Sequence, residues 1–71
     1  MNLIIFQGLA NGKVARSLKN YATEDAALAA MYHELWSAVS NQEVASLVCV
    51  ILADDGETVK REAWSRVAEE V

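Results

Sequence analysis

The chain has 71 residues, a formal net charge of −4 and an apolar content of 54%, with no proline. A chain of this length forms one domain, residues 1–71, and buries only about 60% of the surface that its unfolded form exposes. This composition argues against a disordered tail, and the acidic balance argues against a nucleic-acid binder held by nonspecific phosphate contacts.

The first predicted element is a strand over the apolar run Leu3–Phe6. Asn11-Gly12 follows it, and this dipeptide predicts a two-residue type I′ hairpin turn into a second strand at about 13–21. Such a turn pairs Leu9 with Val14. One face of the hairpin then has Leu3, Ile5, Leu9, Val14 and Leu18. The other face has Ile4, Phe6, Ala15, Ser17 and Tyr21.

A helix is predicted from Ala26 to about Val39, with Thr23 as its N-cap and two acidic residues in its first turn. This segment is rich in alanine and other helix formers. A stripe at three- and four-residue spacing is expected to face the sheet, formed by Leu28, Met31, Tyr32, Leu35 and Val39. Ser40 and Glu43 have the spacing of a capping box, which predicts one further helical turn.

A third strand is predicted over Leu47–Ala53, and Asp54-Asp55-Gly56 marks a second hairpin turn. The fourth strand is then expected over Thr58–Arg66, with Trp64 across from Leu47. A helix is the alternative for this last segment, because its apolar residues are also spaced like one face of a helix. Those residues are Val59, Ala63 and Val67.

The basic residues predict the order of the strands. All six lie on the second strand of a hairpin, at Lys13, Arg16, Lys19, Lys60, Arg61 and Arg66. Charged strands protect the edges of a sheet against aggregation, and apolar strands belong in its middle. The sequence therefore predicts an α+β fold of ββαββ type, a four-stranded antiparallel sheet in the order 2-1-3-4 with one helix on one face.

Neither apolar run alternates with polar residues, as a strand with one wet face should. Both central strands therefore look covered on both faces, yet one helix covers only one face. The second cover is expected from another copy of the chain, because a domain this small has no disulfide pair and needs another source of stability. We expect a homodimer whose interface includes Ile4, Phe6, Cys49, Ile51 and Trp64.

No catalytic, cofactor or metal site is predicted. Cys49 is the only cysteine and lies in an apolar run, which is typical of a small buried side chain. His33 is the only histidine and has no partner that the sequence identifies. Asp54-Asp55-Gly56 lacks the spacing of a calcium loop, and turn chemistry accounts for it. We therefore expect no enzyme activity and no bound cofactor.

The sequence also bears on whether the partner is a nucleic acid or a membrane. Lys60, Arg61 and Arg66 around Trp64 suggest stacking on nucleic acid, but Glu57 and Glu62 lie among them and offset their charge. No apolar stretch reaches the roughly 18 residues that cross a bilayer, and no signal peptide is visible. A single cysteine suits a cytoplasmic location. Neither a membrane nor a nucleic acid is expected as a partner.

The pattern also resembles short proteins encoded among phage and prophage structural genes of gut bacteria. The resemblance spans most of the chain and includes Glu24-Asp25-Ala26, Tyr32-His33, the run 47–52, Asp54-Asp55-Gly56 and the segment 59–64. It implies a ββαββ domain with a virion-associated or accessory role, possible contacts with other phage structural proteins, and no activity.

Three functions remain open from the sequence. The first is a non-catalytic interaction protein that self-associates. The second is a nucleic-acid-binding accessory factor that uses the basic edge strands. The third is a small enzyme whose site forms only between subunits, with His33 as its candidate residue.

Overall fold

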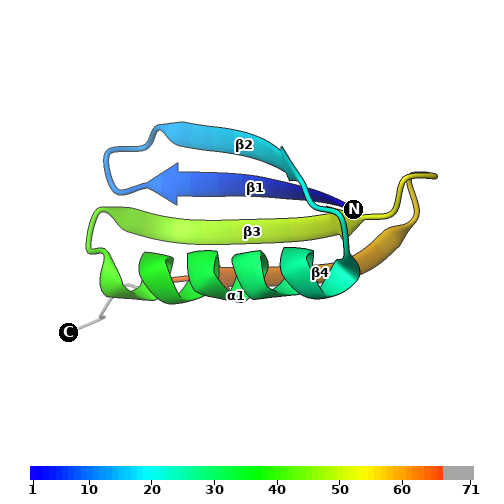
Figure 1. Cartoon of the computed structure of the whole chain (residues 1–71). Coiled ribbons are helices and arrows are strands. Elements are labelled where there is room, and N and C mark those ends of the chain that lie inside the picture. Colours follow the sequence, from blue (N-terminus) through cyan, green and yellow to red (C-terminus); the bar gives the residue numbers. More distant parts are fainter. Residues whose placement is uncertain (67–71) are drawn as a thin grey trace.

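The computed structural model describes residues 1–66, which form four strands and one helix (Figure 1). In chain order these are β1 (Asn2–Leu9), β2 (Val14–Asn20), α1 (Glu24–Ser40), β3 (Val44–Leu52) and β4 (Thr58–Ser65). The strands form one antiparallel sheet in the order β2-β1-β3-β4. The predicted α+β fold of ββαββ type, with sheet order 2-1-3-4, is confirmed.

The segment after the second turn is a strand, as predicted. β4 pairs antiparallel with β3, and Trp64 lies across from Leu47. The helical alternative is wrong for the described part of this segment, because the turn at 54–56 returns the chain along β3. Val67, the last residue of that alternative pattern, lies outside the described residues.

The first hairpin turn differs from the prediction. The N–H of Gly12 donates to the carbonyl of Leu9 at 2.9 Å, and the N–H of Leu9 donates to the carbonyl of Lys13 at 2.8 Å. Gly12 has a φ of +90°, whereas no other residue type among the described residues has a positive φ. The loop is therefore a three-residue type I turn closed by a left-handed glycine. The type I′ prediction is wrong because Asn11 stays at negative φ.

This extra loop residue shifts the pairing of β1 with β2 by one position. Leu18 lies across from Ile4 rather than Ile5, and Val14 lies across from Gly8. A shift of one residue moves every side chain of a strand to the other face of the sheet. Val14 and Leu18 therefore share a face with Ile4, which corrects the predicted faces of the hairpin.

The second hairpin turn has the same form. The N–H of Gly56 donates to the carbonyl of Ala53 at 2.8 Å, and Gly56 also has a φ of +90°. The Oδ1 of Asp55 accepts a hydrogen bond from the N–H of Glu57 at 3.0 Å. The acidic residue here stabilises the turn, which is the role that turn chemistry assigns to it.

Thr23 caps the start of α1, as predicted. Its Oγ1 accepts a hydrogen bond from the N–H of Ala26 at 3.2 Å. The helix ends at Ser40, without the further turn that the capping-box spacing suggested. Instead the N–H of Val44 donates to the carbonyl of Asn41 at 3.0 Å, which closes a tight turn into β3.

The last turn of α1 contains no basic residue of its own, and Arg66 takes this place from beyond β4. Its Nη2 donates to the carbonyl of Asn41 at 3.0 Å and to that of Ala38 at 3.3 Å. Its Nε donates to the carbonyl of Val44 at 3.3 Å. The guanidinium thus adds a charged donor at the helix end, where the carbonyl of Ala38 also accepts a hydrogen bond from the N–H of Asn41 at 3.1 Å. This contact joins the end of the sheet to the end of the helix.

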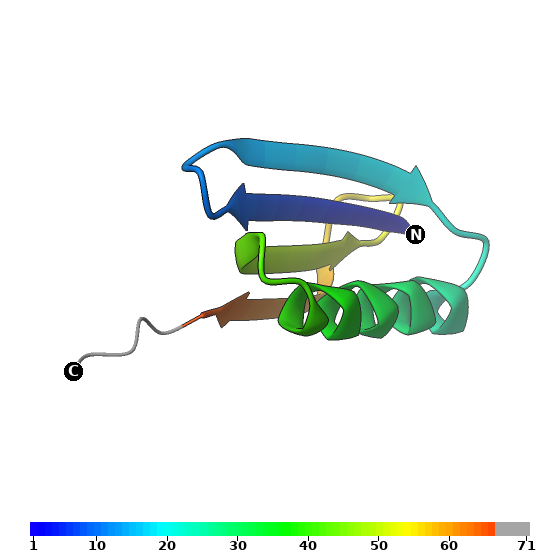
Figure 2. The same cartoon turned by 90° about the vertical axis from the view of Figure 1, so that its left-hand side faces the viewer.

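The predicted stripe of α1 is confirmed in part: Met31 is buried, and Leu28 and Leu35 pack against the core. Ala27, Met31 and Ala38 are buried, whereas Tyr32 and Val39 are about half exposed. The hydrophobic core lies between this helix face and one face of β1 and β3, and its buried residues are Leu3, Ile5, Ala27, Met31, Ala38, Val44, Leu47, Cys49 and Ile51. Figure 2 shows that α1 lies toward β3 and β4, so that β2 is the strand farthest from it.

Candidate functional site: the open face of the sheet

The sheet has one face under α1 and one face that no described segment covers. Leu3 and Ile5 of β1, and Cys49 and Ile51 of β3, are buried on the helix side. Since side chains alternate along a strand, the residues between them point to the other side. We call that side the open face, and its residues are Asn2, Ile4, Phe6, Gly8, Val14, Arg16, Leu18, Asn20, Ser46, Val48, Val50, Leu52, Thr58, Arg61, Ala63 and Ser65.

The middle of the open face is apolar. Ile4 and Phe6 of β1 lie beside Val50 and Val48 of β3, in two neighbouring rows of the sheet. Leu18 of β2 extends one of these rows and is 66% exposed. Val14, also on β2, is 65% exposed, and Phe6 is 41% exposed. Large apolar side chains grouped in this way usually mark a contact surface.

The charges of the open face are two arginines at its opposite edges. Arg16 of β2 pairs across from Phe6, and Arg61 of β4 pairs across from Val50. Among the residues that define the open face there is no carboxylate, although the whole chain has a net charge of −4. A half-turn about the apolar centre exchanges the positions of the two arginines.

The predicted interface residues separate into two groups. Ile4 and Phe6 lie on the open face, as the interface prediction requires. Cys49 and Ile51 lie under the helix and are 0% exposed, so they do not belong to a contact surface. This part of the prediction is corrected: both faces of β3 are apolar, and only the position of α1 decides which face is covered.

Trp64, the fifth predicted interface residue, lies on the helix side of β4. It is partly buried, packs against the hydrophobic core, and its ring centroid lies 5.0 Å from the guanidinium carbon of Arg66. These contacts account for the tryptophan as a structural residue. A role for Trp64 in an interface stays a prediction.

Burial also determines the chemistry of Cys49. Desolvation raises the pKa of its thiol from 9.0 to about 11, and the charges of Glu34 and Glu62 add to the shift in the same direction. A thiol with so high a pKa is protonated at neutral pH and is a poor nucleophile. Cys49 is therefore a packing residue.

A second exposed apolar area lies on α1 and was not predicted. Tyr32 and Trp36 are four residues apart, and Val39 follows three residues later, so the three share one side of the helix. Trp36 is 67% exposed. The sequence placed Tyr32 and Val39 on the buried stripe because their spacing matched that of the large core residues. The small residues Ala27 and Ala38, which do face the sheet, gave no signal.

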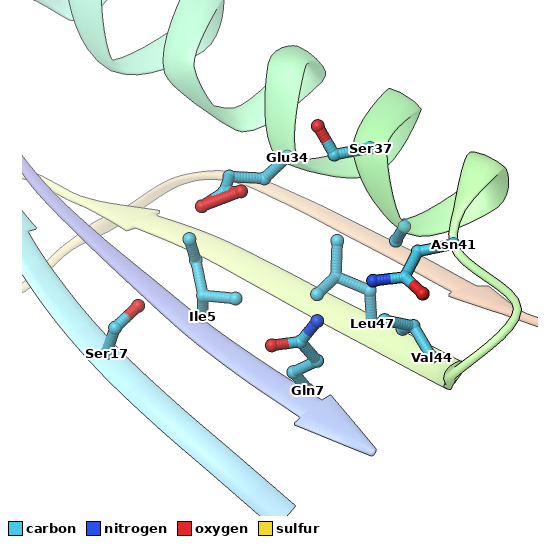
Figure 3. Close-up of a pocket in the computed structure, with 9 residues that line it drawn as sticks. Ile5, Gln7, Ser17, Glu34, Ser37, Asn41, Val44 and Leu47 are labelled. Atoms are coloured by element: carbon cyan, nitrogen blue, oxygen red, sulfur yellow. The ribbon is translucent and has the colours of Figure 1, made fainter. Parts of the chain in front are cut away.

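A small groove lies between α1 and the first two strands (Figure 3). Its volume is about 90 Å³, and Glu34, Ser37 and Asn41 line it from the helix side and its C-terminal turn. Gln7 of β1 and Ser17 of β2 line the opposite wall. The groove brings together one carboxylate with amides and hydroxyls. It contains neither a pair of carboxylates nor a nucleophile beside a base, and His33 is not among its lining residues.

No metal site was found in the part of the chain that the structure describes, where no three histidine, cysteine, aspartate or glutamate residues gather. No helix of residues 1–66 has the length and hydropathy needed to cross a membrane.

Comparisons with known proteins add no further assignment. The sequence matches no protein-family model, and no curated protein or solved structure shows significant similarity to it. The open face is therefore judged on its own geometry.

Proposed function

We propose that this chain is a non-catalytic interaction protein that forms a homodimer by packing two open faces against each other. One observation supports this proposal above the others. An apolar patch extends over β1, β2 and β3, and no described segment covers it. Burying such a patch against a second copy removes apolar area from water, which is the main favourable contribution to protein association.

The size of the open face agrees with a weak but specific dimer. Four strands about 4.8 Å apart, each with seven residues of about 3.3 Å, give a flat area of roughly 450 Å². Two such faces bury roughly 900 Å², and side-chain relief raises the accessible area toward the lower limit of stable interfaces. We therefore expect a dissociation constant in the micromolar range.

The apolar centre of the open face favours a second copy as the partner. In a closed dimer each residue meets the same surface that it helps to form, so the surface must be self-complementary. The apolar centre meets itself, while Arg16 and Arg61 lie on the two edge strands, where a guanidinium reaches water beyond the packed sheets. Two sheets packed face to face cross at about 30°.

Sedimentation velocity tests this dimer. Wild type at about 5 to about 500 µM, a range around a micromolar dissociation constant, should shift from monomer to dimer. Phe6→Lys should abolish the shift without unfolding the chain, because Phe6 lies on the open face and is 41% exposed. Val39→Lys is the matched control, since it also places a charge at an exposed apolar site, but on α1. Wild type that remains monomeric throughout would contradict the proposal, as would equal effects of both variants.

A second candidate function is binding to nucleic acid through the same face. The observation in its favour is that Arg16 and Arg61, on the two edge strands, share the open face with Phe6 and with no carboxylate. Two arginine–phosphate contacts to a single strand give a slope of log K against log salt of about −1.4. Fluorescence anisotropy with a single-stranded oligonucleotide at low salt tests this. Binding that Arg16→Ala and Arg61→Ala both weaken would favour it over the dimer.

A phage-related role, structural or accessory, remains a prediction from the resemblance alone. A cytoplasmic or virion-associated location belongs to the same proposal, and the single unpaired cysteine is its support.

A further inference from the structure

β2 is an edge strand with no cover on either side. It lies first in the sheet order, and all seven of its residues are exposed. α1 packs on β3 and reaches β1, but it lies away from β2 (Figure 2). Edge strands present unpaired N–H and C=O groups that can pair with another chain.

The hydrogen bonds at the two ends of β2 show which of its backbone groups are free. The N–H of Leu9 donates to Lys13, and the N–H of Tyr21 donates to the carbonyl of Met1 at 2.7 Å. In an antiparallel pair, bonded and non-bonded positions alternate. Residues 15, 17 and 19 therefore bond to β1. The backbone groups of four residues point away from the sheet, namely Val14, Arg16, Leu18 and Asn20.

β2 has the charged side chains of a protected edge, Arg16 and Lys19, but it lacks the backbone irregularity that also hinders pairing at an edge. Its ladder with β1 continues over seven residue pairs, from Asn2 with Asn20 to Gly8 with Val14, with no bulge. β4, the other edge, pairs with β3 through an irregularity between Ile51 and Leu52. Bulges of that kind disturb an edge and hinder further pairing.

We propose that β2 pairs antiparallel with β2 of a second copy, with the two-fold axis passing through Ser17. In this register all seven residues overlap, and the outward backbone groups of Arg16 meet those of Leu18 on the partner copy. Lys19 lies across from Ala15. No two cations lie directly opposite each other, whereas a shift of two residues toward the start of the strand places Arg16 across from Arg16.

This contact is distinct from the open-face dimer. It joins two four-stranded sheets into one sheet of eight strands, side by side, and it leaves both open faces free. The two contacts use different groups: backbone atoms at the edge, and side chains on the face. Each can therefore fail without the other.

Ser17→Cys tests the pairing directly. Ser17 bonds to β1, so against a second β2 it forms a non-bonded pair, in which Cα atoms lie about 4.5 Å apart. That separation lies within the range of a disulfide, about 4.4–6.8 Å. Under mild oxidation with diamide, Ser17→Cys should form a covalent dimer at least about tenfold faster than Lys19→Cys. Cys49 is also present in these variants, so wild type is the control for its reaction. Because Cys49 is buried, wild type should form no covalent dimer.

A mixed experiment fixes the register. Ala15→Cys and Lys19→Cys, each alone, place equivalent sulfurs about 13 Å apart along the strands, which is too far for a disulfide. Mixed together, they should form a heterodimer, because residue 15 of one copy lies across from residue 19 of the other. Equal cross-linking of all these variants, or no covalent dimer from Ser17→Cys, would overturn the proposal.

Three further variants separate this contact from the open-face dimer. Leu18→Pro in the Ser17→Cys protein removes an outward N–H but leaves the bonds to β1 intact, so it should abolish cross-linking. Leu18→Thr keeps that N–H and should still cross-link. Phe6→Lys should leave the Ser17→Cys cross-link unchanged, since residue 17 lies on the side opposite to the open face. Loss of the cross-link in Phe6→Lys, with the chain still folded, would contradict a separate edge contact.

Discussion

Arg66 is expected to be the largest single polar contribution to the stability of this fold. Besides the carbonyls of Ala38, Asn41 and Val44, its Nη2 lies 3.4 Å from the carbonyl of Val39. Nη2 has only two protons, so it cannot make four separate hydrogen bonds. The four carbonyls share its two protons, and we call this arrangement the shared cap. The guanidinium is the basic group at the C-terminal end of α1, where the helix dipole is negative.

The magnitude follows from these contacts. A hydrogen bond to a charged group contributes about 1.5–3 kcal/mol, and the long distances and partial exposure place the shared cap near the lower value. The helix dipole adds about 0.5 kcal/mol. Stacking on Trp64 adds about 0.5 kcal/mol. Arg66→Ala should therefore lower the free energy of unfolding by about 2–3 kcal/mol, out of roughly 4–10 kcal/mol for a domain this small.

Urea denaturation followed by circular dichroism measures this loss, at a protein concentration low enough to keep the chain monomeric. Arg66→Lys keeps the charge but loses the planar fork, so it should lose about 1 kcal/mol. Arg61→Ala is the control, an exposed arginine on the open face, and should change stability by less than about 0.5 kcal/mol. If Arg66→Ala and Arg61→Ala unfold at the same urea concentration, the reasoning about the cap is refuted.

The remaining predictions concern the turns and the buried thiol. Gly12→Val should destabilise the fold by about 1–3 kcal/mol in the same urea assay, since a β-branched residue is strained at positive φ, while Gly12→Asn should cost less; equal midpoints for all three proteins would contradict the turn. The unfolded thiol of Cys49 ionises near pH 9, but the folded thiol ionises near 11, so stability should fall as the pH rises through this window. Cys49→Ala should show a smaller fall, and parallel pH profiles would exclude this cause. Labelling of Cys49 by a thiol reagent at pH 8 should follow global unfolding, and rapid labelling of the native protein would show that the thiol is not buried.

The apolar runs and the two glycine turns were enough to predict the fold. Each run is long enough for one strand and too short for a helix, and a turn signal follows each. The register of the first hairpin was not predictable. Asn11-Gly12 fits both a two-residue and a three-residue loop, and the choice depends on whether Asn11 adopts positive φ.

The candidate surface was predicted only in part, because it depends on contacts between distant segments. Spacing correctly placed Leu28, Met31 and Leu35 toward the sheet, but it missed the small residues Ala27 and Ala38, which are also buried there. The same packing decides that Cys49 is covered and that Phe6 is not. The cap from Arg66 joins residues 28 positions apart, from Ala38 to Arg66, and no local pattern signals it.

The most direct test of self-association through the open face is an isotope-filtered NOE experiment on an equal mixture of ¹³C-labelled and unlabelled protein at high concentration. It detects only contacts between copies. We predict contacts from the ring of Phe6 in one copy to the methyl groups of Ile4, Val48 and Val50 in the other, because these side chains form the apolar centre of the face. Contacts between copies that involve only the helix residues Tyr32 and Trp36, or no such contacts at all, would contradict the account.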